Sequence, residues 1–396
     1  MKYVRRAALL VLLLVVLAGG SLLYLQRSPA VLPSAPGRWS AARANAWYAG
    51  QPWLFGANYI PATAINELEM WQAATFDPAT IDKELGWAES LGINTLRVFL
   101  HDLPYQQDPE GFKQRIGQFL SICQKHHIRP MLVLFDSCWD PNPKPGKQPE
   151  PTPGVHNSAW VQSPGATALQ DTTQYRRLQA YVTGIVGAFR DDERVLLWDV
   201  WNEPSNINYV SYRMREPAEK VRLVINLLPR VFQWARQARP SQPLTSGPYE
   251  YGLTNWQEPL RARRMEQIQL ANSDVITFHN YSDQQAFTKR LTELQQLGRP
   301  VMCTEFMARG AASRFETHLP VAKQANVGMY CWGFVAGRTQ TYLPWDSWEK
   351  PYVNGRQPTV WFHEILRPDG SPYRPAEVAL IKQLTQPASA PAQAQR

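Results

Sequence analysis

The sequence predicts an α/β fold, a (β/α)8 TIM barrel formed by one domain with long βα loops. Eight short apolar segments recur along the chain, and most of them are almost continuously apolar, as is typical of parallel strands that are covered on both faces. Segments with helical, amphipathic periodicity separate several of them. An open doubly wound sheet is the alternative. It is disfavoured because no glycine-rich phosphate loop follows the first apolar segment.

In chain order, the expected strands lie within residues 53–59, 93–100, 129–136, 194–202, 242–247, 273–281, 299–306 and 327–334. The helical periodicity is clearest over residues 78–91, 111–127, 173–189, 218–238 and 283–297. The longest loop follows the third strand, and six prolines between residues 141 and 153 stiffen it. We expect this loop to wall the functional site, because loops after the strands build the working face of such barrels.

Both ends of the chain differ in composition from residues 47–385, which form the predicted barrel. Residues 1–26 read as a signal anchor or a cleaved signal peptide, because basic residues precede an uncharged apolar stretch over 7–25. Residues 27–46 are rich in Pro, Ser and Ala and predict a linker, and residues 386–396 predict a disordered tail. We therefore expect export to the periplasm or the cell surface, with the N-terminal segment as a membrane tether if it is not cleaved.

Composition excludes several classes of protein. A hydrophobic fraction of 44% excludes disorder, collagen and coiled coil. The formal net charge is +8, but residues 1–46 hold six basic residues and no acid, and Arg396 adds one more charge. Residues 47–385 are therefore nearly neutral, which argues against a nucleic-acid partner.

Cysteine and histidine spacing indicates no metal site. The four cysteines have no paired ligand spacing, and a buried free thiol is the expectation for each. Cys303 lies two residues before Glu305, so strand alternation predicts that both point into the barrel. The seven histidines show no compact ligand spacing on one element.

Polar side chains gather where the expected strands end, which is the face where such barrels carry out chemistry. Glu203 and Glu305 end the fourth and seventh apolar segments, which face one another across an eight-stranded ring. Two carboxylates that meet across a pocket are the arrangement that glycoside hydrolysis requires. The further candidates are Arg97, Asp136, Asn202, His279, Tyr281 and Trp332.

The stretch WDVWNEP at 198–204, then HNY at 279–281, TEF at 304–306 and Trp332 resemble clan A glycoside hydrolases, and family 5 most of all. The resemblance covers nearly all of residues 50–345 and implies a TIM barrel of the cellulase and mannanase type. Residues 338–373 are also similar to exported bacterial proteins described as cellulase-like or xylanase-like. The chain departs from family 5 at Phe135-Asp136-Ser137, where a His is usual, so Asp136 and Asp102 are expected to alter the polar lining near the sugar.

The resemblance implies that Glu203 is the acid/base and Glu305 the nucleophile. Asn202 would then hold the sugar 2-hydroxyl, and His279 would support the carboxylates. We expect Tyr281 to orient Glu305 and Arg97 to favour its ionised form. Trp332 offers a flat face to the sugar. Weaker aromatic candidates, with core packing as the alternative, are Trp139, Trp201, Trp256 and Trp345.

The sequence thus predicts a retaining glycoside hydrolase that cleaves a β-linked glycan by double displacement and needs no cofactor or metal. We expect a monomer whose partner is a carbohydrate substrate. Two alternatives stay open. A transglycosylase would use the same residues with a sugar as acceptor, and a catalytically silent carbohydrate-binding barrel would keep the fold only.

The fate of the N-terminal segment can be read from the mature protein. If residues 7–25 are an uncleaved anchor, the native protein fractionates with membranes and begins at or near Met1. N-terminal sequencing of the membrane fraction tests this expectation. A mature terminus at about residues 19–31 would contradict the anchor and establish a cleaved signal peptide.

Overall fold

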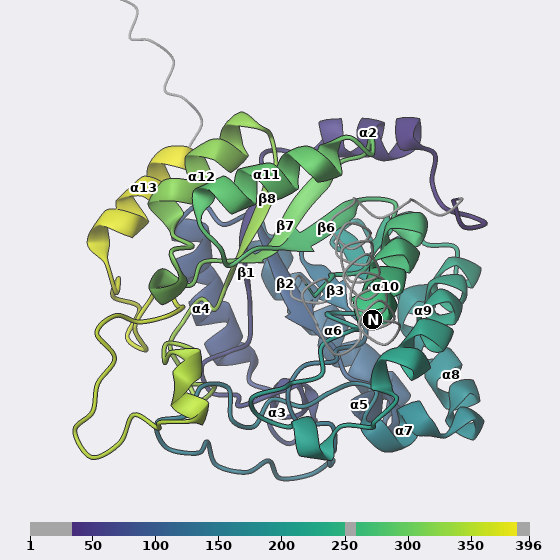
Figure 1. The fold of residues 1–396 in the computed structure, drawn as a ribbon, viewed down its shortest axis with the longest axis horizontal. Helices are drawn as coiled ribbons and strands as arrows, with labels where there is room; N and C mark the ends of the chain where they lie inside the picture. The colour runs from purple at the N-terminus through teal and green to yellow at the C-terminus, as the bar shows by residue number, and fades with distance from the viewer. Residues whose placement is uncertain (1–33, 250–258, 386–396) are drawn as a thin grey trace, which may run out of the picture.

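The computed structural model describes residues 34–249 and 259–385 and confirms the (β/α)8 barrel (Figure 1). Every predicted apolar segment contains one strand, and all strand pairs are parallel. The strands are β1 (Phe55–Asn58), β2 (Thr95–Phe99), β3 (Met131–Val133), β4 (Leu197–Asp199), β5 (Leu244–Thr245), β6 (Ile276–His279), β7 (Val301–Phe306) and β8 (Gly328–Trp332).

The strands form one sheet in the order β5-β4-β3-β2-β1-β8-β7-β6, so β5 and β6 are its two ends. These ends meet and nearly close the ring. The amide of Asp274 donates to the carbonyl of Leu244 at 2.8 Å. The hydroxyls of Thr245 and Thr277 lie 2.9 Å apart. Strand ends that are far apart in the sequence therefore face one shared mouth.

Helices surround the barrel, and the five predicted ones are present as α4 (Pro78–Ser90), α6 (Pro109–Lys125), α8 (Tyr175–Ala188), α9 (Lys220–Gln237) and α11 (Gln284–Gln295). The sequence reading missed α2 (Ala41–Ala49), α3 (Glu67–Trp71), α5 (Asp102–Gln107), α7 (Ala166–Gln170), α10 (Pro259–Asn272), α12 (Phe315–Gln324) and α13 (Pro375–Thr385). Five of the missed helices, α3, α5, α7, α10 and α12, lie between strands, and α10 and α12 are the longest of these. An internal Pro320 weakens the pattern of α12, and α10 has three arginines among its first six residues.

Residues 34–49 pack against the barrel, so the C-terminal part of the segment predicted as a linker, residues 27–46, is structured. The Ser40 side chain caps α2 by accepting from the amide of Arg43, and the Trp39 amide donates to Asp274 at 2.7 Å. Tyr48 packs with Leu54, beneath the barrel interior. Burial of these two aromatic side chains outweighs the Pro, Ser and Ala content on which the linker prediction rested.

The predicted anchor or signal at 1–26 and the predicted tail at 386–396 lie outside the described residues and stay predictions. Within residues 34–249 and 259–385, no helix is both long and apolar enough to cross a membrane.

The four cysteines are free and buried, as expected. Cys303, however, does not point into the barrel as the sequence predicts. A β-bulge interrupts β7 between Cys303 and Phe306. Cys303 packs in the cluster that includes Phe306, whereas Met302 packs with Tyr330 beneath the site. The prediction that Cys303 and Glu305 share the inward face is therefore wrong, because the bulge breaks the two-residue alternation.

One buried ion pair ties the C-terminal helix to the mouth of the barrel. Arg309, which follows β7, pairs with Glu377 of α13 at 2.6 Å. Its guanidinium also donates to the carbonyls of Trp361, His363 and Glu364. Both side chains of the pair are more than nine-tenths buried.

We expect Arg309→Ala to lower the free energy of unfolding by about 3–5 kcal/mol, because it leaves the buried Glu377 carboxylate with only the largely solvated Arg374, 3.5 Å away, as a cation partner. Urea unfolding measures the change. The matched control is Arg222→Ala, which breaks an exposed pair with Glu219 and is expected to cost less than about 1 kcal/mol. Equal losses in the two variants would contradict this account.

Candidate active site

A cavity of about 250 Å³ opens at the carboxyl end of the strands, and five of the predicted residues line it. They are Glu203, His279, Tyr281, Glu305 and Trp332. The loop after β3 contributes Cys138, Trp139 and His156 to its wall, as the sequence predicts for this loop. The structure therefore brings together strand ends as far apart in the chain as Glu203 and Trp332, which are about 130 residues apart.

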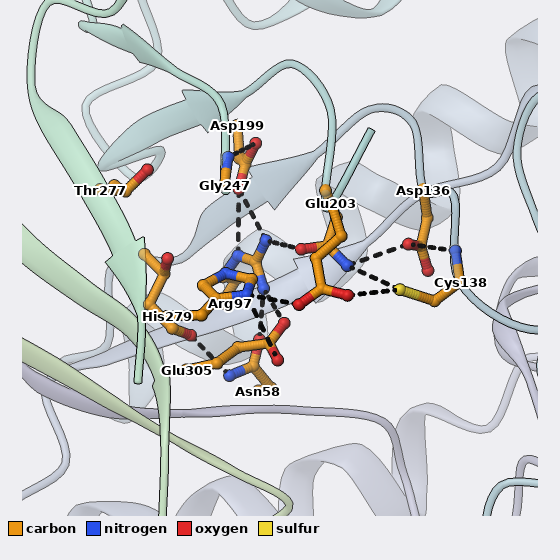
Figure 2. Close-up of polar contacts among 12 residues, drawn as sticks. Asn58, Arg97, Asp136, Cys138, Asp199, Glu203, Gly247, Thr277, His279 and Glu305 are labelled. Carbon is orange, nitrogen blue, oxygen red and sulfur yellow. Dashed lines mark hydrogen bonds and ion pairs between the residues drawn. The ribbon is translucent and has the colours of Figure 1, made fainter. Parts of the chain in front are cut away.

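Glu203 follows β4 on a sharp turn. Its φ of 44° lies in the left-handed region, which is uncommon for a residue with a side chain. Figure 2 shows its carboxylate beside His279 and Cys138, and Asn206 is a third partner. His279 Nδ1 lies 2.8 Å from Oε1, the Asn206 amide donates to Oε2 at 2.8 Å, and the Cys138 thiol donates to Oε2 at 3.2 Å. Burial raises the pKa of Glu203 above its ordinary value, which favours the protonated form.

Glu305 on β7 has a different set of partners. The Tyr281 hydroxyl donates to Oε2 at 2.8 Å, and Arg97 donates to Oε1 at 2.9 Å. Burial raises the pKa of this carboxyl too, while the charge of Arg97 and the hydrogen bond from Tyr281 oppose the rise. The predicted contacts of Tyr281 and Arg97 with Glu305 are therefore present, and both favour the carboxylate form of Glu305.

Arg97 on β2 lies at the centre of the polar network and is fully buried. Its guanidinium pairs with Asp199 of β4 at 2.7 Å and with Glu305 at 2.9 Å, and it donates to Asn58 (Figure 2). It also donates to Asn202. Burial disfavours its charge, but the two carboxylates outweigh that cost and raise the pKa of the guanidinium. Arg97 therefore carries a fixed positive charge beneath the cavity.

His279, at the end of β6, lies between the two glutamates. Burial lowers the pKa of its ring to about 4, so the imidazole is neutral near neutral pH. Its Nδ1 lies 2.8 Å from Glu203 and 3.6 Å from Glu305. Gly247 leaves room for this packing, because a Cβ there would approach Arg97 Nη2 to 2.9 Å and His279 Nε2 to 3.0 Å.

Three predicted contributors, Arg97, Asp136 and Asn202, lie behind the cavity and do not line it. The Asn202 amide oxygen accepts from Arg97, and its nitrogen donates to Asp136 at 2.9 Å. Asp136 also accepts from Trp160 at 2.7 Å. Their polar atoms bind one another in this structure, and none of the three lines the cavity. Asp102 is likewise buried, against Arg177 and Ser163.

Aromatic side chains form much of the wall. Trp332, Trp345, Trp348 and Trp139 line the cavity, and the last two stack with ring centroids 5.5 Å apart. Trp201 is buried and donates to the Ser137 hydroxyl, so it packs in the core and does not line the cavity. Trp256 lies outside the described residues.

The sequence reading missed the roles of four side chains, namely Asn58, Cys138, Asp199 and Asn206. Asp199 carried a usable signal, because an acid inside the apolar stretch 194–202 requires a buried cation. The contacts of Cys138 and Asn206 with Glu203 arise from loop geometry that no local pattern encodes.

One oxygen from each of Glu203 and Glu305 and one ring nitrogen of His279 lie within 4.8 Å of one another. Retaining glycosidases hold their two carboxyl groups about 5–5.5 Å apart, and inverting ones about 6.5–9.5 Å apart. The three groups are also spaced for a metal ion. However, Glu305 already binds the guanidinium of Arg97, whose charge would repel a cation. The arrangement therefore suits proton transfer and nucleophilic attack better than metal binding.

Comparison with known proteins gives one family match, to the family described as cellulase (glycosyl hydrolase family 5), over residues 87–351. A comparison with curated proteins gives no match. Many solved structures share the fold, among them the following three. The exo-β-1,4-mannosidase of an Opitutaceae bacterium is 18% identical with a TM-score of 0.55, over 91% of this chain and 61% of its own, so the chain spans about three-fifths of that protein. A GH5_18 protein from Streptomyces cattleya in complex with Manβ1-4GlcNAc is 14% identical with a TM-score of 0.58, over 86% and 82%. The endo-β-1,4-mannanase of Thermotoga petrophila is 14% identical with a TM-score of 0.53, over 85% and 77%.

We expect Tyr281→Phe to raise the pKa of Glu305 by about one unit or more, because the lost hydrogen bond stabilises the carboxylate. The ionised form then appears only at higher pH. Carboxyl ¹³C NMR of labelled glutamates, assigned with Glu305→Gln, measures the shift. Tyr175→Phe, at a residue outside the cavity lining, is the control. A pKa that falls or stays unchanged in Tyr281→Phe would contradict the role of this hydrogen bond.

Proposed function

The chain belongs to glycosyl hydrolase family 5 and carries that family's glycosidase barrel, and from this premise we propose that it cleaves β-linked glycans with retention of configuration. One observation carries the proposal: carboxylates from β4 and β7 meet across a cavity with their nearest oxygens within 4.8 Å. That spacing suits direct attack of one carboxylate on the sugar, and it is too short for the water that an inverting enzyme places between the sugar and its base.

In the first step, the Glu305 carboxylate attacks the anomeric carbon while Glu203 gives its proton to the leaving oxygen. The bond from the anomeric carbon to the leaving oxygen breaks, and a glycosyl ester forms on Glu305. Arg97 and Tyr281 hold both oxygens of Glu305 before attack, which orients one lone pair at the sugar. Burial raises the pKa of Glu203, which favours the protonated form that this step needs.

In the second step, Glu203 is ionised and accepts a proton from water as the water attacks the anomeric carbon. The ester bond breaks, and Glu305 leaves as a carboxylate. Neutral His279 and Asn206 support Glu203 through both of its charge states. A sugar hydroxyl in place of water would give transglycosylation through the same residues.

The substrate class follows from the aromatic lining and from the fold neighbours. Trp332 presents an apolar face to the C–H face of a sugar that lies over Glu305. The solved structures named above include proteins described as a mannosidase and a mannanase. We therefore propose β-linked mannosides as the first substrates to test, with gluco- and xylo-oligosaccharides alongside. Export to the periplasm or cell surface remains part of the proposal.

Glu305→Ala is expected to abolish turnover, and a 2-fluoro sugar with a good leaving group is expected to label Glu305 in the unaltered enzyme. Glu203→Ala should slow natural glycosides by about 10²–10⁴-fold, because the leaving oxygen then receives no proton. Formation of the intermediate from an activated aryl glycoside should barely change. Azide should rescue its breakdown, because the small anion needs no general base. Mass spectrometry of the labelled peptide and kinetics on both substrates measure these effects.

The control is Glu349→Ala, which removes an exposed glutamate of the loop after β8 and should leave every rate unchanged. NMR of the first product reports its anomeric configuration. Inverted product, or label on another residue, would overturn the assignment of Glu305 even with the barrel correct.

A further inference from the structure

Two long loops meet over one side of the barrel mouth. We call residues 137–165 the β3 loop and residues 333–374 the β8 loop. The Asn157 amide donates to the Thr339 carbonyl at 2.8 Å, and His156 Nδ1 lies 2.8 Å from the Leu343 carbonyl. The His156 amide donates to the Ser347 hydroxyl at 3.0 Å. The β3 loop and the β8 loop therefore form one bridge.

The two loops are closely packed where they meet, and we call this region of contact the joint. The Tyr352 amide donates to the Gly154 carbonyl at 2.9 Å, and the Gly154 amide donates to Gln340 at 3.1 Å. Gly154 has a φ of 72°, and a Cβ there would come within 2.4 Å of the Tyr352 carbonyl oxygen. Only glycine allows the two backbones to approach this closely.

The bridge spans the ends of β1 and β2, because these two strands lie between β8 and β3 in the ring. The space beneath it is filled. Trp160 of the β3 loop packs against Phe99 of β2 at 5.3 Å and against Trp332 of β8 at 5.8 Å between ring centroids. The cavity left among these residues is about 20 Å³, which holds at most one water molecule. No sugar ring fits there.

The proposed mechanism fixes how a glycan must lie relative to this bridge. The leaving group is next to Glu203, which protonates it, and the sugar that is attacked lies over Glu305 and Trp332. Glu203 follows β4, and Trp332 ends β8, on the opposite side of an eight-stranded ring. The non-reducing end of the attacked sugar therefore points away from Glu203, toward β8 and the bridge.

The end of the cavity beside the bridge carries a polar group that suits a terminal hydroxyl. The ring of His363 lies 5.5 Å from that of His156, and both line the cavity. Burial lowers the pKa of His363 well below its ordinary value, and its Nδ1 donates to the Met307 carbonyl at 2.6 Å. Its Nε2 is therefore an acceptor, and it has no partner within the described residues.

From these observations we propose that the bridge closes the cavity one sugar beyond the cleaved bond, so that the enzyme acts on the non-reducing end and removes single sugars. This inference rests on the proposed function and adds the mode of attack. An enzyme that cuts within a chain needs open space for at least a second sugar on this side, and Trp160 occupies that space.

The test compares pentasaccharides that carry a label on the reducing end, with the non-reducing terminus either free or blocked by a 4,6-O-benzylidene group. Manno-, gluco- and xylo-configured pentasaccharides are used, with a 4-O-methyl block for the xylose series. The free forms of the true substrate should shorten by one sugar at a time. The blocked form should react about 100-fold more slowly or worse, because the added group meets the bridge. First products shortened by two or more sugars, or equal rates for both forms, would overturn the inference.

A variant of the joint tests the cause. Gln340→Ala combined with Ser347→Ala removes bonds between the two loops and leaves the residues of the mechanism intact. Cleavage of the blocked pentasaccharide should rise about tenfold or more, while the rate on an aryl glycoside, which has one sugar, stays unchanged. Asp369→Ala, which removes an exposed side chain of the β8 loop that bonds, among the described residues, only to the neighbouring Ser371, is the control. No gain in the double variant would show that the bridge is not what excludes the chain.

The proposed function and this inference fail in different ways. If no free pentasaccharide is hydrolysed, each pair is titrated calorimetrically into Glu305→Gln. Binding of the free form alone supports the closed end, and equal binding of the blocked form overturns it. If neither form of any sugar binds, the proposed function falls, and the inference falls with it.

Discussion

The buried charge of Arg97 is the constraint on which the site depends. A guanidinium buried away from solvent requires anionic partners, and here Asp199 of β4 and Glu305 of β7 supply them. The same group donates to Asn58 at the end of β1. Four strand ends are thereby held to one point, which sets the separation of the two glutamates. Loss of the Arg97 charge would leave the buried carboxylates of Asp199 and Glu305 without this cation.

The two glutamates are chemically identical, and their surroundings make them different. Burial raises the pKa of both. Only Glu305 touches Arg97, whereas Glu203 faces a neutral His279, a thiol and an amide. The first environment favours a carboxylate and the second tolerates a carboxylic acid. The division into nucleophile and proton donor therefore follows from which strand end lies nearest the guanidinium.

The barrel and its loops carry separate parts of the proposed activity. Strand ends hold the reacting groups rigidly, because each strand is hydrogen-bonded to its neighbours. The β3 loop and the β8 loop decide how much of a glycan fits. Their joint combines backbone hydrogen bonds, bonds that use the side chains of Gln340, Ser347 and His156, and one glycine. Changes within the bridge can therefore alter the mode of attack without disturbing the chemistry beneath it.

The amino-acid sequence by itself determined the barrel, its eight strands and the pair Glu203 and Glu305, because continuous apolar segments and polar strand ends are local patterns. Tertiary structure alone decided the rest. It placed Arg97, Asp136 and Asn202 behind the cavity, and a bulge in β7 turned Cys303 away from Glu305. It also packed residues 34–49 onto the barrel and joined two loops about 200 residues apart. These outcomes depend on which distant polar and aromatic groups satisfy one another in a closed interior, and no local pattern records that competition.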